Sequence, residues 1–425
     1  MNQFHLQRLA NQLQVVTVPM AHVRSVTVLA LVKAGTRLET EKTNGISHFL
    51  EHMVFKGTRK YPSALKLASA VDAVGAEINA FTGKEYTGFY VKAAADHLAL
   101  ALEIVGELVF NPLIPEKELE TERGVILEEI RMYEDQPMAK IKMDFESLLY
   151  SNTSLGWLTL GREENIKNLS RQDFRAYRQR FYRPRRILLA LAGNDQAVKS
   201  SGKLVRQYFG KQGGNLTDLE VNKKLVFNQG KPAEKITRKK TEQAHLCLGV
   251  RTYAKGGPKR YRLAVLSSLL GGGMSSRLFT EIREKRGLAY YVKSGVQAYS
   301  DNGYLVMQAG TEAKNIKQVV KLALNEFNKV KQGRFSLKEL KKAKEYLKGQ
   351  FVLSLEDSQS LADLYAEDIL IEGQPRTPAE IIKATDQVTK EEVQAVAEEI
   401  FIEKRLNLAV ITPKEPGGIG KVLQF

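Results

Sequence analysis

The chain has 425 residues but only one cysteine, Cys247, and one tryptophan, Trp157. A single cysteine excludes an internal disulfide, so a hydrophobic core has to hold the fold, and the chain suits a reducing compartment. The longest apolar stretches, such as Ser25–Val32 and Ile187–Ala192, have the length of a strand and are too short for a membrane-spanning helix. The N-terminus lacks the continuous apolar segment of a secretion signal. We therefore expect a cytoplasmic protein with no membrane segment.

Positively charged residues outnumber negatively charged ones. The 64 lysines and arginines exceed the 48 acidic residues, giving a formal net charge of +16, which raises the question of a nucleic-acid partner. The basic runs at Arg238–Lys240 and Lys338–Lys344 are, however, separated by acidic sequence and carry no interleaved aromatic residues. We expect solvated basic faces and no nucleic-acid partner.

Length and periodicity indicate two domains. Short Val-rich segments predict strands, and long segments with apolar residues at helical spacing predict helices in both halves of the chain. A polar, glycine-bearing stretch without steady period separates the halves. The expected organisation is an N-terminal domain at 1–210, a linker at 211–231, and a C-terminal domain at 232–425.

The order of predicted elements in the second half repeats that of the first. Lys117-Glu118-Leu119 opens one long predicted helix and Lys338-Glu339-Leu340 opens another at the equivalent place. The period is about half the chain, which indicates an internal duplication rather than a solenoid. The predicted fold class is α+β, with two similar domains, each a mainly antiparallel sheet packed with helices.

The sharpest motif is His48-Phe49-Leu50-Glu51-His52. On a helix, residues i and i+4 lie on one face and i+3 lies beside them, so both imidazoles can reach one metal ion with Glu51 next to it. Zinc suits two imidazoles, and a catalytic zinc needs a third protein ligand and an open position for water. Glu51 is then the candidate general base that takes the proton of that water. The competing interpretation is a helix whose histidines pair locally or face solvent.

The third ligand is expected on a second helix, which opens at Pro115 and is rich in glutamate. Glu122 and Glu129 are seven residues apart, two turns along one face of that helix. Such charges often form only a solvated face. Spacing alone does not choose between Glu128 and Glu129 as the ligand.

Four segments together resemble the pitrilysin/insulinase family of inverzincin zinc metallopeptidases, and the chain length resembles its short, processing-peptidase-like branch. They occur in family order along the chain and are far more specific than the five-residue motif. Their sequences are GISHFLEHMVFKGT (45–58), INAFTGKEYTGFYV (78–91), ERGVILEEIRMYEDQP (122–137) and LGGGMSSRLFTEIREKRGLAYYV (270–292).

The resemblance implies a set of roles. Glu129 corresponds to the third zinc ligand beside His48 and His52, with one zinc ion per chain, and Glu122 to the acidic residue that assists the site. The strand at Asn79, Ala80 and Phe81 corresponds to the one along which family members lay an extended substrate. The substrate-contacting Arg/Tyr pair of the family matches Arg283 and Tyr290. Without the resemblance, that strand reads as an ordinary half-buried one and Arg283 as a partner of a neighbouring glutamate.

The same resemblance implies an endopeptidase that hydrolyses peptide bonds in unstructured peptides or protein termini. Alignment of the two long helices puts Ala343 opposite Glu122 and Gln350 opposite Glu129, so only the first domain is expected to bind zinc. Longer family members enclose substrate between two halves, each the size of this chain, which implies a homodimer or a heterodimer with a zinc-less homologue. The alternative function is a catalytically silent structural or assembly subunit of a heterodimer.

Overall fold

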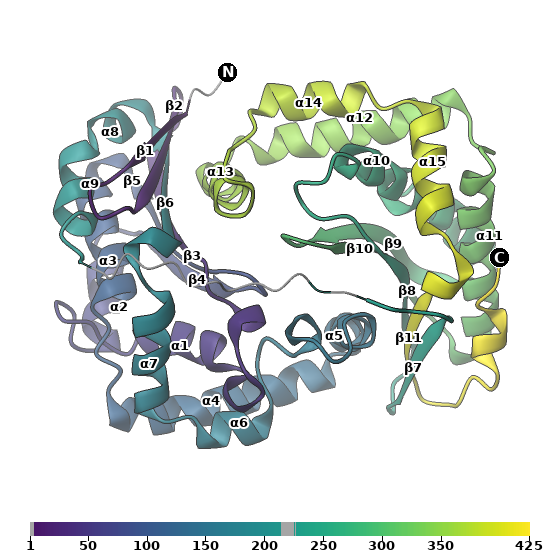
Figure 1. The fold of residues 1–425 in the computed structure, drawn as a ribbon, viewed down its shortest axis with the longest axis horizontal. Helices are drawn as coiled ribbons and strands as arrows, with labels where there is room; N and C mark the ends of the chain where they lie inside the picture. The colour runs from purple at the N-terminus through teal and green to yellow at the C-terminus, as the bar shows by residue number, and fades with distance from the viewer. Residues whose placement is uncertain (1–3, 214–224, 226) are drawn as a thin grey trace. The chain divides into compact units, whose positions relative to one another are not determined.

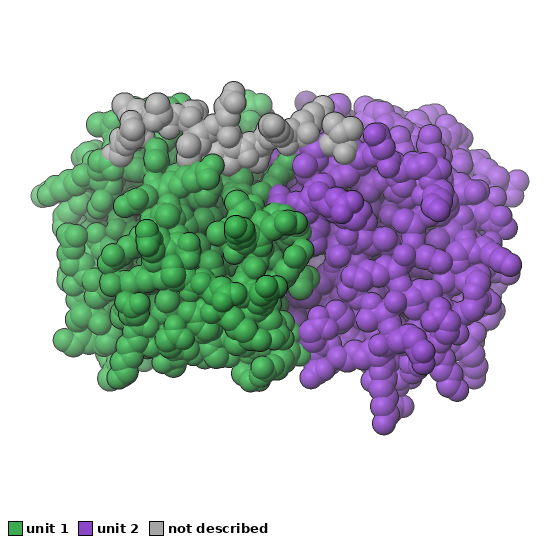
Figure 2. All heavy atoms as spheres, turned by 60° about the horizontal axis from the view of Figure 1, so that its bottom comes forward, with its two compact units in different colours: residues 1–131, 157–222, 354–377 green, residues 132–156, 223–353, 378–425 purple. Residues whose placement is uncertain are grey.

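Two compact units make up the fold, and each draws on both halves of the sequence. The structure is a computed structural model that describes residues 4–213, 225 and 227–425. Unit 1 comprises residues 1–131, 157–222 and 354–377, and unit 2 comprises 132–156, 223–353 and 378–425 (Figure 2). Most of the predicted linker, residues 214–224 and 226, lies outside the described residues. The units therefore exchange two segments, unlike the contiguous division expected at 211–231.

Unit 1 is built on a six-stranded sheet with the strand order β1-β2-β6-β3-β5-β4 (Figure 1). Only the pairing of β2 with β6 is parallel, and the other pairs are antiparallel. The strands are β1 (His5–Arg8), β2 (Gln14–Met20), β3 (Ser25–Val32), β4 (Glu77–Thr82), β5 (Thr87–Ala94) and β6 (Ile187–Asn194).

Helices cover both faces of this sheet, which explains why β3 is apolar at nearly every position. Leu29 and Leu31 of β3 pack in one cluster with α13, while α3 also contacts β3 and β5. The helices of unit 1 are α1 (Ile46–Val54), α2 (Ala64–Asp72), α3 (Leu98–Phe110), most of α4 (Glu116–Asp135), α6 (Glu163–Asn168), α7 (Arg171–Phe181), α8 (Asp195–Ser200), α9 (Gly202–Phe209) and α13 (Ser358–Glu372).

Unit 2 has a five-stranded sheet with the order β7-β11-β8-β10-β9. Its strands are β7 (Ala233–Arg238), β8 (Ala244–Thr252), β9 (Ala289–Ala298), β10 (Gly303–Thr311) and β11 (Asn407–Thr412). Its helices are α5 (Pro137–Leu149), α10 (Arg260–Gly271), the π-helical η6 (Phe279–Glu284), α11 (Ile316–Lys331), most of α12 (Leu337–Ser354), α14 (Pro378–Asp386) and α15 (Lys390–Ile400).

The two sheets have the same topology. In each, one parallel pair (β2 with β6, β7 with β11) is followed by the same three antiparallel pairings, and β1 is an addition to the first sheet. This confirms the predicted α+β fold of two similar domains with mainly antiparallel sheets. No helix among the described residues is both long and apolar enough to span a membrane.

The exchanged segments are equivalent helices. After the long helix α4, α5 packs on β7, β8 and β11 of the second sheet, and after the long helix α12, α13 packs on β2, β3 and β6 of the first. Tyr365 and Leu361 of α13 are fully buried among residues of the first sheet, and Phe145 of α5 is buried beside Cys247 of the second. Each half of the sequence thus supplies part of the core of the other unit.

Candidate metal centre

Helix α1 presents His48, Glu51 and His52 from a helix that is otherwise buried. Phe49 and Leu50, between the two histidines, have no exposed surface, and Phe49 packs edge-on against Phe174 of α7 with ring centroids 5.0 Å apart. The buried apolar residues fix the rotation of the helix. The i, i+3, i+4 spacing then brings the three polar side chains to one side, and the two imidazole centroids lie 4.6 Å apart.

Helix α4 contributes two carboxylates to the same place. Ile126 and Ile130 are buried and hold α4 against unit 1, and Glu122 is only 3% exposed. Glu129 lies next to the histidines, whereas the Glu128 carboxylate is largely exposed and pairs with Arg131. Spacing in the sequence left Glu128 and Glu129 as alternatives for the third ligand. The geometry favours Glu129.

Three side chains converge on one point. The Glu129 Oε2 atom lies 3.5 Å from His48 Nε2 and 3.5 Å from His52 Nε2, and one ligand atom from each of the three residues lies within 4.8 Å of the others. Zinc bonds of about 2.0–2.1 Å in tetrahedral geometry hold neighbouring ligand atoms about 3.4 Å apart, which matches these separations. Glu129 Oε2 is buried and has no hydrogen-bond partner among the described residues. The two nitrogens and one oxygen fit a divalent transition metal such as zinc.

The second carboxylate of α4 holds one of the histidines. Glu122 Oε1 lies 2.8 Å from His52 Nδ1, which leaves Nε2 of that ring directed at Glu129. Lys56, one turn after His52, forms an ion pair with Glu122 Oε2. Burial alone raises the pKa of Glu122, but the contacts with His52 and Lys56 outweigh it and lower that pKa. An ionised Glu122 accepting the Nδ1 proton is the arrangement that orients a histidine ligand.

The neighbouring carboxylates shift the pKa of His52 in the opposite direction from that of His48. Burial of His48 and the proximity of His52 lower the pKa of His48 to about 3, so its imidazole is neutral and able to donate a lone pair. Burial also lowers the pKa of His52, but the hydrogen bond to Glu122 and the charges of Glu129 and Glu122 raise it overall. Burial raises the pKa of Glu129. These carboxylates surround His52 with negative charge, which favours a bound cation.

Glu51 projects from α1 toward the end of β4. Thr82 Oγ1 donates a hydrogen bond of 2.5 Å to Glu51 Oε2. Burial raises the pKa of Glu51, an effect that the Thr82 hydrogen bond partly offsets. Only one of the carboxylate oxygens is engaged by Thr82, and the raised pKa brings Glu51 closer to the range that suits a general base.

Strand β4 forms the edge of the first sheet beside α1. Its one strand partner among the described residues is β5, so β4 has no strand paired to its other backbone edge there. Asn79, Ala80 and Phe81 lie in the middle of this strand, and Phe81 packs edge-on against Tyr86 with centroids 6.3 Å apart. The strand therefore has the geometry for main-chain pairing with an extended peptide.

Arg283 and Tyr290 belong to unit 2. Arg283 lies on η6, and its guanidinium stacks over the rings of Phe279, at 4.9 Å, and of Tyr290, at 5.4 Å. Tyr290 is 73% exposed. Arg283 and Tyr290 thus contact each other within unit 2, whereas His48, His52 and Glu129 belong to unit 1. Local π-helical winding of this kind often occurs at functional positions.

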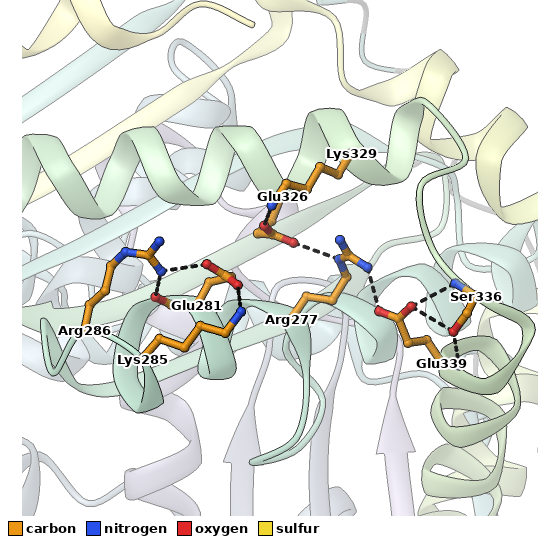
Figure 3. Close-up of polar contacts among 8 residues, drawn as sticks. All are labelled: Arg277, Glu281, Lys285, Arg286, Glu326, Lys329, Ser336 and Glu339. Carbon is orange, nitrogen blue, oxygen red and sulfur yellow. Dashed lines mark hydrogen bonds and ion pairs between the residues drawn. The ribbon is translucent and has the colours of Figure 1, made fainter.

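A network of ion pairs holds the segment that leads into η6 (Figure 3). Arg277 contacts Glu326 of α11 at 2.8 Å and Glu339 of α12 at 2.6 Å, and Glu326 is only 2% exposed. Glu339 also accepts the backbone N–H of Ser336 at 2.8 Å. Arg277 thereby fixes the start of η6 to two helices of unit 2.

Sequence reasoning passed over two residues of the metal centre. Lys56 and Thr82 each contact a carboxylate of the centre, Glu122 and Glu51 respectively. Both stand inside the segments that carry the family resemblance, 45–58 and 78–91. Neither residue belongs to the His/Glu pattern from which the site was predicted, so only the contacts identify them.

Comparison with known proteins decides the family. Residues 14–162 match the sequence model described as insulinase (peptidase family M16), and residues 168–347 match the peptidase M16 inactive domain. A Bacillus subtilis protein called uncharacterized zinc protease YmxG is 40% identical over 92% of this chain and 94% of its own length. The chain belongs to peptidase family M16. The expected membership of the pitrilysin/insulinase family is thus confirmed.

Further proteins are similar to this chain in sequence or in fold. A Streptomyces coelicolor protein called uncharacterized zinc protease SCO5738 is 37% identical over 94% of this chain and 88% of its own length. The crystal structure of a Helicobacter pylori protease covers 97% of this chain and 100% of its own, with a TM-score of 0.89 and 25% identity. A Pseudomonas fluorescens structure described as a peptidase M16 inactive domain has the same fold, with a TM-score of 0.86 at 18% identity over 97% of this chain.

Proposed function

We propose that this M16 chain is a zinc-dependent endopeptidase that cleaves unstructured peptides or protein termini. The observation that carries the proposal is the convergence of His48, His52 and Glu129 on one point, with Glu51 beside them on α1. The relatives from B. subtilis and S. coelicolor carry the name zinc protease, which supports zinc as the metal. One zinc ion per chain is expected, because the described residues contain a single such group.

When bound, zinc would polarise the scissile carbonyl and acidify a water molecule in its open position. Glu51 would take a proton from that water as the water oxygen attacks the scissile carbonyl carbon, and would pass the proton to the amine nitrogen as the C–N bond breaks. Thr82 holds the other oxygen of Glu51, and Glu122 holds His52 through its Nδ1 atom. The residues of α1, α4 and β4 thus divide the work of ligation, proton transfer and orientation.

Main-chain pairing with β4 is the proposed mode of substrate binding. An extended peptide added along Asn79, Ala80 and Phe81 would be held through its backbone irrespective of its side chains. Arg283 and Tyr290 are proposed to contact substrate from the second unit, with the Tyr290 hydroxyl available to stabilise a developing oxyanion. Because Tyr290 is 73% exposed, its ring is accessible to a ligand.

We also propose that the active form is a dimer in the cytoplasm. In this arrangement Arg283 and Tyr290 of one subunit serve the zinc centre of the other, and a homodimer is self-sufficient because the chain carries both sets. A partner without zinc is the heterodimeric variant of the same idea. Light-scattering mass over a concentration series tests it, and a monomer with full activity would contradict it.

The decisive experiment combines metal analysis with peptide cleavage by the wild type and Glu51→Gln. The wild type is expected to contain one zinc ion and to cleave an unstructured peptide. The variant should retain the zinc and lose activity by about 10²–10⁴-fold, the usual contribution of a general base. Zinc retained with equally fast cleavage would remove Glu51 as the base.

The competing function is a silent assembly subunit. It would predict neither zinc nor cleavage in the wild type. The presence of His48, Glu51, His52 and Glu129 in one cluster argues against it, because a subunit without activity has no need to keep all four.

A further inference from the structure

A buried glutamate outside the metal centre contacts the first turn of α1. Glu39 is 7% exposed and lies shortly before the helix in the chain. Its Oε2 atom accepts hydrogen bonds from the backbone N–H of Gly45 and the side-chain amide of Asn44, and its Oε1 atom accepts the backbone N–H of Ser47. All three distances are 2.9 Å. Ser47 immediately precedes His48, so the last of these bonds lies next to a metal ligand.

The hydrogen bonds from Asn44, Gly45 and Ser47 favour the ionised form of Glu39, but burial outweighs them and raises the pKa of this carboxyl overall. Each of the three partners is an N–H group that can only donate, and both carboxylate oxygens are used as acceptors. Among the described residues Glu39 forms no ion pair, so the partial positive charge at the start of α1 compensates its charge. A glutamine of the same size has one acceptor oxygen and one NH₂ group, which would have to face a donor.

The start of α1 has little room to move around Glu39. Gly45 has φ = 103°, and a Cβ atom there would lie 2.8 Å from Gly161 Cα, so the chain packs closely at this glycine. Asn44 also donates to the carbonyl of Leu158 at 2.9 Å, and Ser47 Oγ lies 2.8 Å from Tyr177 Oη of α7. Glu39 is the acceptor that joins three of these groups at one point.

We infer that Glu39 is a positioning residue for the metal centre, setting the place of α1 and thus of His48 and His52. The inference rests on the proposed zinc site. Two of the three candidate ligand atoms lie on α1 and the third lies on α4. The 3.5 Å separations between the histidine Nε2 atoms and Glu129 Oε2 therefore depend on where α1 begins and on its direction. Loss of the Glu39 carboxylate is therefore expected to change the distances from the two histidines to Glu129, in addition to lowering the stability of α1.

The test compares zinc affinity in the wild type, Glu39→Gln and a control, Asp357→Asn. Asp357 also accepts a backbone N–H at the start of a helix in unit 1, from Ser360 at 2.8 Å, but its helix α13 carries no ligand. Affinity is measured by competition with a chromogenic chelator, and ligand geometry by the visible spectrum of the Co²⁺-loaded protein. Glu39→Gln should bind zinc about 10–100-fold more weakly, with an altered Co²⁺ spectrum. Asp357→Asn should bind as the wild type does.

Failure of this inference is separable from failure of the proposed function. A wild type that binds no zinc contradicts the proposed function itself. A folded Glu39→Gln protein with wild-type zinc affinity and Co²⁺ spectrum, even if less stable, overturns only the role of Glu39. If Glu39→Gln does not fold, Asn44→Ala takes its place. This variant removes one of the three donors to Glu39 and keeps the carboxylate, and it is expected to bind zinc about 3–10-fold more weakly than the wild type. Unchanged affinity and spectrum in that folded variant would equally overturn the inference.

Discussion

Glu122 Oε1 lies 2.8 Å from His52 Nδ1, while the other nitrogen of the same ring faces Glu129. One helix, α4, therefore both supplies the carboxylate of the proposed metal centre and contacts a histidine of α1. Glu122 and Glu129 are seven residues apart, which is about two turns of helix, so both side chains project from the same face of α4.

Replacement of Glu122 by glutamine should weaken zinc binding without unfolding unit 1. Glutamine keeps the size of the side chain but removes the charge that makes the His52 ring a strong ligand. A 10–100-fold loss of affinity is expected from chelator competition, as is typical of residues that orient metal ligands. Glu128→Gln is the matched control on the same helix, because the Glu128 carboxylate is exposed and pairs with Arg131 rather than with a histidine of the centre. Equal losses in both variants would contradict the assigned role.

Thr82→Val should impair turnover while leaving the metal in place. The substitution keeps the shape of the side chain but removes the hydroxyl that donates to Glu51 Oε2. We expect kcat to fall about 10–100-fold, since a hydrogen bond to a charged group is worth about 1.5–3 kcal/mol, with KM and zinc content little changed. Thr87→Val is the control on the neighbouring strand, where the hydroxyl donates to the carbonyl of Ala34 instead. A kcat that stays at the wild-type value would exclude orientation of Glu51 by Thr82.

Asp363→Asn should stabilise the protein at neutral pH. Burial and the charges of Glu367 and Asp357 raise the pKa of Asp363 from 3.8 to about 6. The folded state binds an extra proton between these values, so stability falls as pH rises from about 4 to 6, and the loss is complete above that range. Removing the charge should add about 1–2 kcal/mol at pH 7.5 after allowance for partial exposure.

The measurement for Asp363→Asn is Tm at two pH values. The gain in Tm should be present at pH 7.5 and absent at pH 4, where the carboxyl of the wild type is neutral. Asp72→Asn, at the exposed end of α2, should change Tm at neither pH. An equal gain at both pH values would show that charge at Asp363 is not the cause.

Separate expression of the two halves should fail, and co-expression should succeed. A chain that ends at residue 226 lacks α13 and leaves Leu29, Leu31 and their neighbours uncovered, and a chain that starts at 227 lacks α5. Each half alone is expected to aggregate because a large apolar face is exposed. Together they should form a 1:1 complex, measured by size-exclusion chromatography with light scattering. A monomeric 1–226 fragment with cooperative unfolding would contradict mutual dependence of the halves.

The sequence predicted the local features of the centre better than the architecture around it. The His48–His52 motif depends on helical spacing within five residues, and the repeated order of strands and helices depends on local periodicity, so both could be read from the chain. The exchange of α5 and α13 could not, because an amphipathic helix shows which of its faces is buried but not which sheet buries it. Thr82 and Lys56 were missed for a similar reason, since their roles come from contacts with residues 31 and 66 positions away.

The position of α13 in the chain has a consequence for synthesis on the ribosome. Strand β6 completes the first sheet at Asn194, but the helix that covers one face of it begins only at Ser358. At ordinary rates of translation, the intervening stretch of roughly 160 residues takes about 10–30 s to emerge. During that interval the residues Val16, Leu29 and Leu188 lack the native contacts that α13 provides, so an apolar face of the nascent chain is exposed to aggregation until Ser358 and the residues after it are made.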